Sequence, residues 1–290
     1  MGSHRSTAAC LAAFATAGLL SACAQETYRD PLERNIAVNQ SRHVAEAFED
    51  RPVVLDDPLG LETAELFFPR SETLVLCDAT VEAQLRAASI AVLANAPMMV
   101  YDPSRHAEYA AAIARMQTDT VLTVGDVSIA PSSGALRVRR DPGGLRALGK
   151  MTSVRFTEQA VGEPGDAVKA VAELNQRTPT WLRATWADPI ALPGAVAQPF
   201  PIQSRRDANM APQVVATRYS SIPSVANARA YGALVTVVPL PNPRRAEATM
   251  FAMAGLSERP LVALGSQFGT SEELAFRIRA AERQYAERIR

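Results

Sequence analysis

Residues 118–126, TDTVLTVGD, decide the fold because they have a counterpart at residues 258–266, ERPLVALGS. Each stretch is a short apolar run that ends in glycine, and an offset of 140 pairs Gly125 with Gly265. The same offset aligns the apolar pairs at 74–75 and 214–215. Matching runs at a steady offset indicate an internal duplication.

Each copy has the order strand, helix, strand, helix, strand. Short apolar strands that alternate with helices are typical of βαβ units with parallel sheets. We therefore expect an α/β fold of two tandem Rossmann-like βαβ modules, related by a pseudo-two-fold axis. The expected strands are 74–77, 98–101 and 121–124 in the first copy and 214–217, 235–238 and 261–264 in the second; the expected helices are 81–94, 105–116, 224–233 and 244–255.

The N-terminus predicts export and lipidation. A short polar start with His4 and Arg5 precedes an apolar run at residues 8–20, which has signal-peptide length and is too short to span a bilayer. The following LSAC at 20–23 resembles the lipobox of bacterial lipoproteins, in which cleavage precedes the cysteine and that cysteine receives the lipid. The resemblance places the chain on the extracytoplasmic face of the cell membrane, anchored through Cys23.

Composition and charge bear on the expected fold class and partners, and the predicted segments complete the organisation of the chain. With 48% hydrophobic and 21% charged residues the chain is globular, and 30 basic against 30 acidic residues give no reason to expect nucleic acid as a partner. The predicted divisions are a signal peptide at 1–22, a tether at 23–50, a first module at 51–150 and a second module at 151–290. The second module includes a Pro- and Trp-containing insertion at 178–211 and an amphipathic C-terminal helix at 272–290.

Several segments in order resemble the cell wall-binding repeat 2 module of Gram-positive surface proteins. They are LETA at 61–64, FPRSETLVL at 68–76, NAPMMV at 95–100 and TVLTVG at 120–125, followed by a looser second copy over 154–280. The resemblance implies a compact Rossmann-like unit that binds cell-envelope polymer without catalysis. The chain departs from the family in the number of modules, because two are recognised here and family members usually carry three beside a separate domain.

Catalytic patterns are absent from the sequence. After Cys23 only His43 and His106 remain, which is little material for a histidine-dependent triad or a multi-histidine metal site. No nucleophile elbow, phosphate-binding loop or dinucleotide fingerprint occurs. Cys77 lies in an apolar strand, where a buried small hydrophobe is the expected role. We expect a non-enzyme with no cofactor and no metal.

Candidate binding residues fall into three groups. The first lies just beyond strand ends, where open parallel sheets collect ligands, and the second consists of arginines that could hold anions or stay as solvated surface charge. The third is a pair of tryptophans, which could stack on sugar rings or pin a long loop. A glycine turn at 265–269 before a helix capped by Thr270 and Glu273 could hold an anion or be a plain turn. The candidates are Asp78, Asp102, Asp126 and Ser266; Arg137, Arg139, Arg140, Arg244 and Arg245; and Trp181 and Trp186.

These observations favour a lipid-anchored, non-catalytic cell-envelope protein that binds cell-wall polysaccharide or an envelope protein. Two alternatives stay open. One is a solute-binding lipoprotein of an ABC transporter, since such proteins also pair two α/β lobes around a cleft, although here each copy reads as sequentially complete. The other is an envelope enzyme, which would need a cleft with convergent polar side chains.

Overall fold

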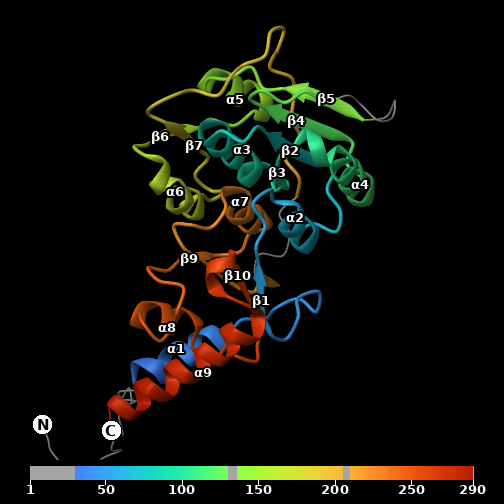
Figure 1. Cartoon of the computed structure of the whole chain (residues 1–290). Coiled ribbons are helices and arrows are strands. Elements are labelled where there is room, and N and C mark those ends of the chain that lie inside the picture. The colour runs from blue at the N-terminus through green and yellow to red at the C-terminus, as the bar shows by residue number, and fades with distance from the viewer. Residues whose placement is uncertain (1–29, 130–135, 205–209, 290) are drawn as a thin grey trace, which may run out of the picture.

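The computed structural model describes residues 30–129, 136–204 and 210–289, so the predicted signal peptide and Cys23 lie outside the described residues. The described chain is an α/β fold whose strands form parallel pairs in three sheets, which confirms the predicted fold class. Figure 1 shows an elongated molecule, with one four-stranded sheet towards the top and the other towards the bottom. Of the helices described, none combines the length and apolar character that a bilayer crossing requires.

The upper sheet belongs to the first copy of the duplication. Its strand order is β3 (Met98–Val100), β2 (Thr73–Cys77), β4 (Thr120–Val124) and β5 (Arg137–Arg140). Helix α3 (Val81–Ala94) connects β2 to β3, and the short η1 (Pro103–Arg105) with α4 (His106–Met116) connects β3 to β4. All residues of β2, β3 and β4 are buried, as the continuous apolar runs predict for strands covered on both faces.

The lower sheet repeats this order with one strand from elsewhere in the chain. Its order is β9 (Val235–Val237), β8 (Gln213–Ala216), β10 (Leu261–Leu264) and β1 (Pro52–Leu55), with α7 (Ile222–Tyr231) and α8 (Glu247–Met253) as connections. The predicted first module at 51–150 therefore differs from the structure at its start, because β1 pairs with β10. Strand β1 is apolar and occupies the position beside β10 that β5 occupies beside β4. The second copy is thus not sequentially complete.

Helices α3 and α7 join the two copies by packing directly on each other. Eleven of the fourteen residues of α3 are buried, which is the pattern of a helix that is apolar on nearly every side. Each helix begins with a hydroxyl cap: Thr80 accepts from the Ala83 N–H, and Ser221 accepts from the Ser224 N–H. Equivalent helices therefore form the interface, as a duplicated pair predicts.

A third, smaller βαβ unit lies between the two copies in sequence. It consists of β6 (Thr157–Val161), α6 (Ala167–Glu173) after the short η2 (Pro164–Asp166), and β7 (Thr180–Ala184) in parallel with β6. It follows α5 (Leu145–Thr152). The predicted insertion at 178–211 therefore begins inside this unit, and its first residues form a strand. Helix α6 contacts both α3 and α7, so the helices of all three units meet.

The two ends of the described chain pack together at the bottom of the molecule in Figure 1. Helix α1 (Pro31–Gln40) contacts α8, and buried Leu32 shares a small apolar cluster with Tyr285 of α9 (Ser271–Arg288). The Asn39 amide donates to the carbonyl oxygens of Phe251 and Ala254 at 3.0 and 2.9 Å. These contacts differ from the tether expected over residues 23–50, because from residue 30 onward the segment is part of the fold. The predicted C-terminal helix is present as α9.

Candidate functional site: a groove beside the buried Arg86–Asp141 pair

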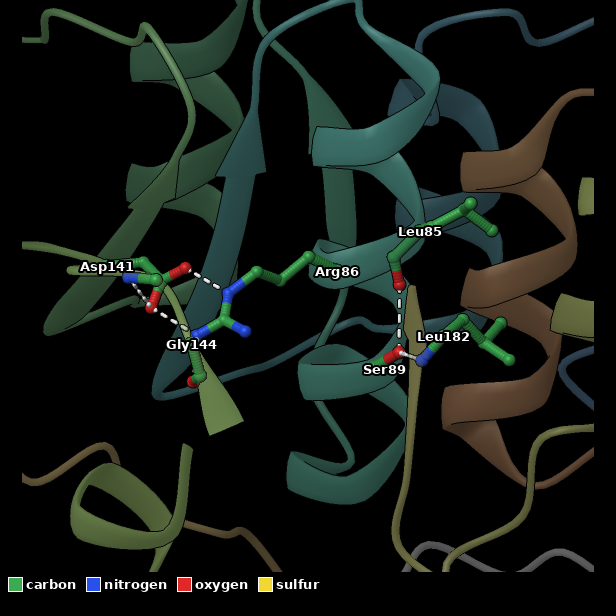
Figure 2. Close-up of polar contacts among 7 residues, drawn as sticks. Leu85, Arg86, Ser89, Asp141, Gly144 and Leu182 are labelled. Atoms are coloured by element: carbon green, nitrogen blue, oxygen red, sulfur yellow. Dashed lines mark hydrogen bonds and ion pairs between the residues drawn. The ribbon is translucent and has the colours of Figure 1, made fainter. Parts of the chain in front are cut away.

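A buried ion pair fixes the wall of the candidate site. Arg86 of α3 and Asp141, which follows β5, have side chains that are 0% and 2% exposed. The Arg86 Nε donates to Asp141 Oδ2, and its Nη2 donates to Asp141 Oδ1 at 2.9 Å and to the Gly144 carbonyl oxygen at 3.1 Å (Figure 2). A guanidinium fork of this kind holds the chain after β5 in one position against α3.

Trp181 of β7 lies beside this pair. The guanidinium carbon of Arg86 is 5.0 Å from the Trp181 ring centroid, and that of Arg183 is 5.8 Å from it. The indole is only 5% exposed. Because arginines lie over the ring and its surface is buried, Trp181 pins β7 to the core and is not an open platform for a sugar ring, which favours the second of its two predicted roles.

A further contact holds α3 against β7, the strand that carries two of the lining residues. The Ser89 hydroxyl donates to the Leu85 carbonyl oxygen and accepts from the Leu182 N–H, both at 2.9 Å (Figure 2). This hydroxyl satisfies a strand-edge N–H that would otherwise be buried without a partner. It fixes the distance between α3 and the strand that carries Trp181 and Arg183.

A groove of about 480 Å3 lies beside Trp181 and the turn that follows Asp141, and Arg86, Asp141, Ser89 and Leu182 are not among its lining residues. Its polar groups are Arg183 and Asp188, which bond to each other at 2.9 and 3.2 Å, and Arg183 also contacts Glu158 at 3.2 Å. The Arg183 guanidinium lowers the pKa of Asp188 below its ordinary value of 3.8, so this carboxylate stays ionised at neutral pH. The remaining lining is Pro142, Gly143, Gly144, Trp181, Pro189 and Ala191.

The chemistry of this groove suits hydroxyl-rich ligands. A partly apolar surface with a few fixed polar groups is the usual composition of a small-molecule or oligomer site. Arg183 and Asp188 are both exposed and present donors and acceptors side by side. Trp186, at 40% exposed, lies on the same loop and donates from Nε1 to Glu82 Oε2 at 3.2 Å. Trp186 is therefore the more accessible of the two predicted tryptophans.

The predicted aspartates lie along the carboxyl edge of the upper sheet, but two of them serve local turns. Asp78 accepts from Thr80 through Oδ1 and from the Asp126 N–H through Oδ2 at 2.8 Å. Asp102 accepts from the Ser104 N–H and hydroxyl at 2.9 and 2.7 Å, and these bonds lower its pKa. Of these three aspartates, Asp126 is the one whose carboxylate, which is exposed, makes no hydrogen bond with a described residue.

The shared glycine explains how each sheet edge is filled. Gly125 and Gly265 both have positive φ, and a Cβ there would lie 2.0 Å from the Asp78 carboxylate in one copy and 2.2 Å from the Gln267 amide in the other. In the second copy the Gln267 amide donates to Thr217 Oγ1 at 2.9 Å and to the Leu264 carbonyl oxygen at 3.1 Å. The space beside Gly125 is therefore filled by the Asp78 side chain, and the space beside Gly265 by the Gln267 side chain.

The turn at 265–269 is accordingly an internally bonded connection rather than an open anion site. It forms the short η4 (Ser266–Phe268), in which Ser266 is exposed and its carbonyl oxygen accepts from the Gly269 N–H at 2.9 Å. The predicted cap of α9 is present, since Thr270 and Glu273 bond reciprocally.

The arginine groups are dispersed in the structure. Arg137, Arg139 and Arg140 lie on edge strand β5, where alternation puts the first two on one face and Arg140 on the other. Burial lowers the pKa of Arg139, whose Nη1 has no hydrogen-bond partner. Arg244 and Arg245 are exposed in the turn before α8 and border a shallow hollow against α9.

The described residues hold no metal-binding cluster and no exposed thiol. No group of three histidine, cysteine or acidic side chains among them is placed to hold a metal ion. Cys77 is fully buried, and that burial raises the pKa of its thiol, which disfavours the reactive thiolate. His106 Nδ1 lies 3.0 Å from the Tyr101 hydroxyl in an exposed position.

Sequence patterns did not single out Arg86, Asp141, Arg183 or Asp188. Arg86 carried one detectable signal, because it is the only basic residue in a helix whose other side chains are mostly small and apolar. A lone charge in a helix that reads as buried needs a partner. Its partner, Asp141, comes 55 residues later and follows β5, so the pairing depends on how the chain folds back against α3.

Comparisons with known proteins give two structural neighbours. No protein-family model matches the chain, and a search of curated proteins finds no match. Cwp6 from Clostridium difficile matches with a TM-score of 0.41 at 13% identity, over 77% of this chain and 48% of that one. Cwp8 from the same organism matches with a TM-score of 0.45 at 14% identity, over 80% and 52%. The chain thus spans about half the length of these proteins, and the likeness is too weak to carry a conclusion.

Proposed function

We propose that this chain is a non-catalytic binding protein of the cell envelope, anchored outside the cytoplasmic membrane through a lipid on Cys23. Its ligand in this proposal is a cell-wall polysaccharide, bound in the groove lined by Arg183, Asp188 and Gly144. The single observation that carries the proposal is this groove, in which an ionised carboxylate and a guanidinium are fixed beside an apolar surface. The lipobox-like LSAC and the resemblance to cell wall-binding repeats support the location and the ligand class.

The alternative of a transporter's solute-binding protein has less support. Such proteins close two lobes on a solute in a cleft between them. Here the corresponding space is filled by α3 and α7, which pack on each other through buried residues. Closure around a solute would require these helices to separate.

Binding is tested by retention of soluble protein, residues 24–290, on purified cell-wall polysaccharide. We expect retention of the unaltered chain and at least about a tenfold loss in the double variant Arg183→Ala/Asp188→Ala, because truncating paired polar groups in a site commonly costs that much. The matched control is Arg105→Ala/Glu108→Ala, which removes another exposed ion pair, of 2.5 Å, far from the groove. Failure of the unaltered chain to bind would contradict the proposal, as would equal losses in the two variants.

Anchoring is tested separately in a Gram-positive host. A chain with Cys23 should incorporate labelled palmitate and sediment with membranes, and Cys23→Ser should do neither. Cys77→Ser is the control, because this buried residue has no part in the predicted lipidation. Equal labelling of the Cys23→Ser variant and the unaltered chain would refute the lipid anchor.

A further inference from the structure

The three βαβ units close into a ring. In each unit the second strand has an outer edge, and a helix from another unit lies against it: α7 against β3, α3 against β7, and α6 against β9. Strand edges expose unpaired N–H and C=O groups, so each of these three edges needs partners or solvent. The three interfaces can therefore be compared with one another.

Two of the three edges have hydrogen-bond partners. At β3 the Met98 N–H donates to the Asn227 amide oxygen at 2.7 Å, and the Val100 N–H donates to the Leu59 carbonyl oxygen at 2.9 Å. At β7 the Leu182 N–H donates to Ser89, as described above. The helix that covers each of these edges thus supplies a polar side chain, and at β3 the bend at residues 58–60 adds the Leu59 carbonyl group.

The edge of β9 differs. The Val238 N–H donates to Ala216 of β8 at 2.8 Å, so by alternation along a parallel ladder the N–H groups of Val235 and Val237 point away from the sheet. No described residue accepts a hydrogen bond from either group. Helix α6 lines this edge with Lys169, Ala172 and Glu173, of which only the Glu173 carboxylate is an acceptor, and it takes no hydrogen bond from either group.

A cavity of about 450 Å3 lies at this edge. In the first module the space between β3 and α7 is filled by the segment from Asp57 to Gly60. The carbonyl oxygen of Asp57 accepts from Ser221 and Ser224 of α7 at 2.6 and 2.7 Å, and that of Leu59 accepts from β3. The described chain has no corresponding segment at β9, which leaves the cavity between α6 and the strand.

The surroundings of the cavity indicate the kind of occupant. Its apolar lining comes from Val235, Val237, Val238 and Pro239 on one side and Ala172 on the other. Lys169 and Arg218 line it with Glu173, which gives one excess positive charge. Neither cation has an ion-pair partner among the described residues, and Arg218 lies over the Tyr219 ring at 5.2 Å, so an acidic group of the occupant can pair with either cation.

We infer that this cavity, the β9 edge site, binds a short extended segment of a partner polypeptide. At β3 the bend at residues 58–60 supplies a single carbonyl group, that of Leu59, and the partner segment supplies the equivalent group at β9. One carbonyl group accepts from the Val237 N–H, an apolar side chain enters the cavity, and an adjacent acidic side chain contacts Lys169 or Arg218. This site lies on the lower sheet and is independent of the polysaccharide groove beside Arg86.

The probe is the capped peptide LDDPLGL, the sequence of residues 55–61, which contains the segment that occupies the equivalent place in the first module. Added at millimolar concentration to soluble protein, it should shift the amide resonances of Val235 and Val237 and slow hydrogen exchange at Val237 at least about tenfold. The control peptide has Asp in place of the leucine that corresponds to Leu59. It should have no such effect, because a charge would enter the apolar cavity.

Two variants separate edge pairing from simple apolar contact. Val237→Pro removes the outward N–H, which an edge strand tolerates, and should weaken peptide binding at least about tenfold. Val237→Ala keeps the N–H and should weaken it less than about threefold. If Val237→Pro does not fold, Lys169→Glu tests the charge contact instead, because it places like charge beside the peptide's aspartates and should weaken binding; unchanged binding would overturn the inference.

Three outcomes would overturn the inference. The first is no perturbation at β9 by millimolar LDDPLGL. The second is equal binding of the peptide by Val237→Pro and Val237→Ala. The third is protection of Val237 that grows with protein concentration in the absence of peptide, which would make a second copy of the chain the occupant. Polysaccharide retention by Val237→Pro should be unchanged, so failure of this inference is distinguishable from failure of the proposed function.

Discussion

The Arg86–Asp141 pair should show strong non-additivity in a double-mutant cycle. Both side chains are essentially inaccessible, so Arg86→Met or Asp141→Leu alone leaves a buried charge without its partner. Each single variant should lose about 3–5 kcal/mol of unfolding free energy. The double variant should lose less than either single variant, since a matched apolar pair needs no compensating charge, and Arg86 Nη1 already lacks a hydrogen-bond partner.

Urea unfolding followed by far-UV circular dichroism and tryptophan fluorescence measures this effect. With a slope of about 3 kcal/mol per molar urea, each single substitution should lower the midpoint by roughly 1–2 M. The control cycle is the exposed pair Arg105–Glu108, whose coupling should be close to the limit of detection. Additive losses at Arg86 and Asp141, with the double variant the least stable of the set, would refute the account of this pair.

Three further predictions concern other parts of the molecule. Asn227→Leu should destabilise the chain by at least about 2 kcal/mol in thermal or urea unfolding, because the buried Met98 N–H loses its acceptor, whereas Asn35→Ala on α1 should change little. The Asp188 carboxyl should titrate by NMR below 3.8; since its folded pKa is lowered, its stabilising bond with Arg183 is present above that value and lost as pH falls, and Arg183→Gln should return the pKa towards 3.8. In protein lacking residues 1–23, Cys77 should react with a thiol reagent only after unfolding, and rapid labelling of the native chain would contradict its burial.

The duplication predicted the two main sheets because strand periodicity and helix spacing are local signals. Runs such as 121–124 and 261–264 are apolar over their whole length, and only a strand buried on both faces accommodates this pattern. The positions of the shared glycines also follow from local geometry. The side chain that packs against each glycine cannot be predicted from local geometry, because Asp78 follows a neighbouring strand whereas Gln267 lies in the turn itself.

Long-range pairing could not be read from the sequence in the same way. The apolar stretch at 52–55 is compatible with either sheet, and its pairing with β10, more than 200 residues later, depends on which sheet edge is left open. The unit formed by β6, α6 and β7 was missed because β6 is mostly exposed and lacks an apolar run. The groove residues were missed for a related reason, since Arg183 and Asp188 resemble ordinary surface charges until the fold of the loop brings them together.

Packing of the N-terminal helix has a consequence for the proposed anchor. Helix α1 begins at Pro31, only a few residues after Cys23, and packs on α8 and α9. A lipid on Cys23 would therefore hold this end of the molecule near the membrane. Helix α3 and strand β7, which lie beside the groove, are found in the upper part of Figure 1, at the other end of the molecule from α1 and α9.

Hydrogen exchange in the presence of polysaccharide fragments decides whether the groove beside the buried pair binds cell-wall polysaccharide. If it does, exchange should slow in the backbone at 142–144 and 183–191, with the β9 edge site unchanged. The protection should disappear in Arg183→Ala/Asp188→Ala and persist in Arg105→Ala/Glu108→Ala. Protection confined to another surface, or none at saturating fragment, would contradict the claim.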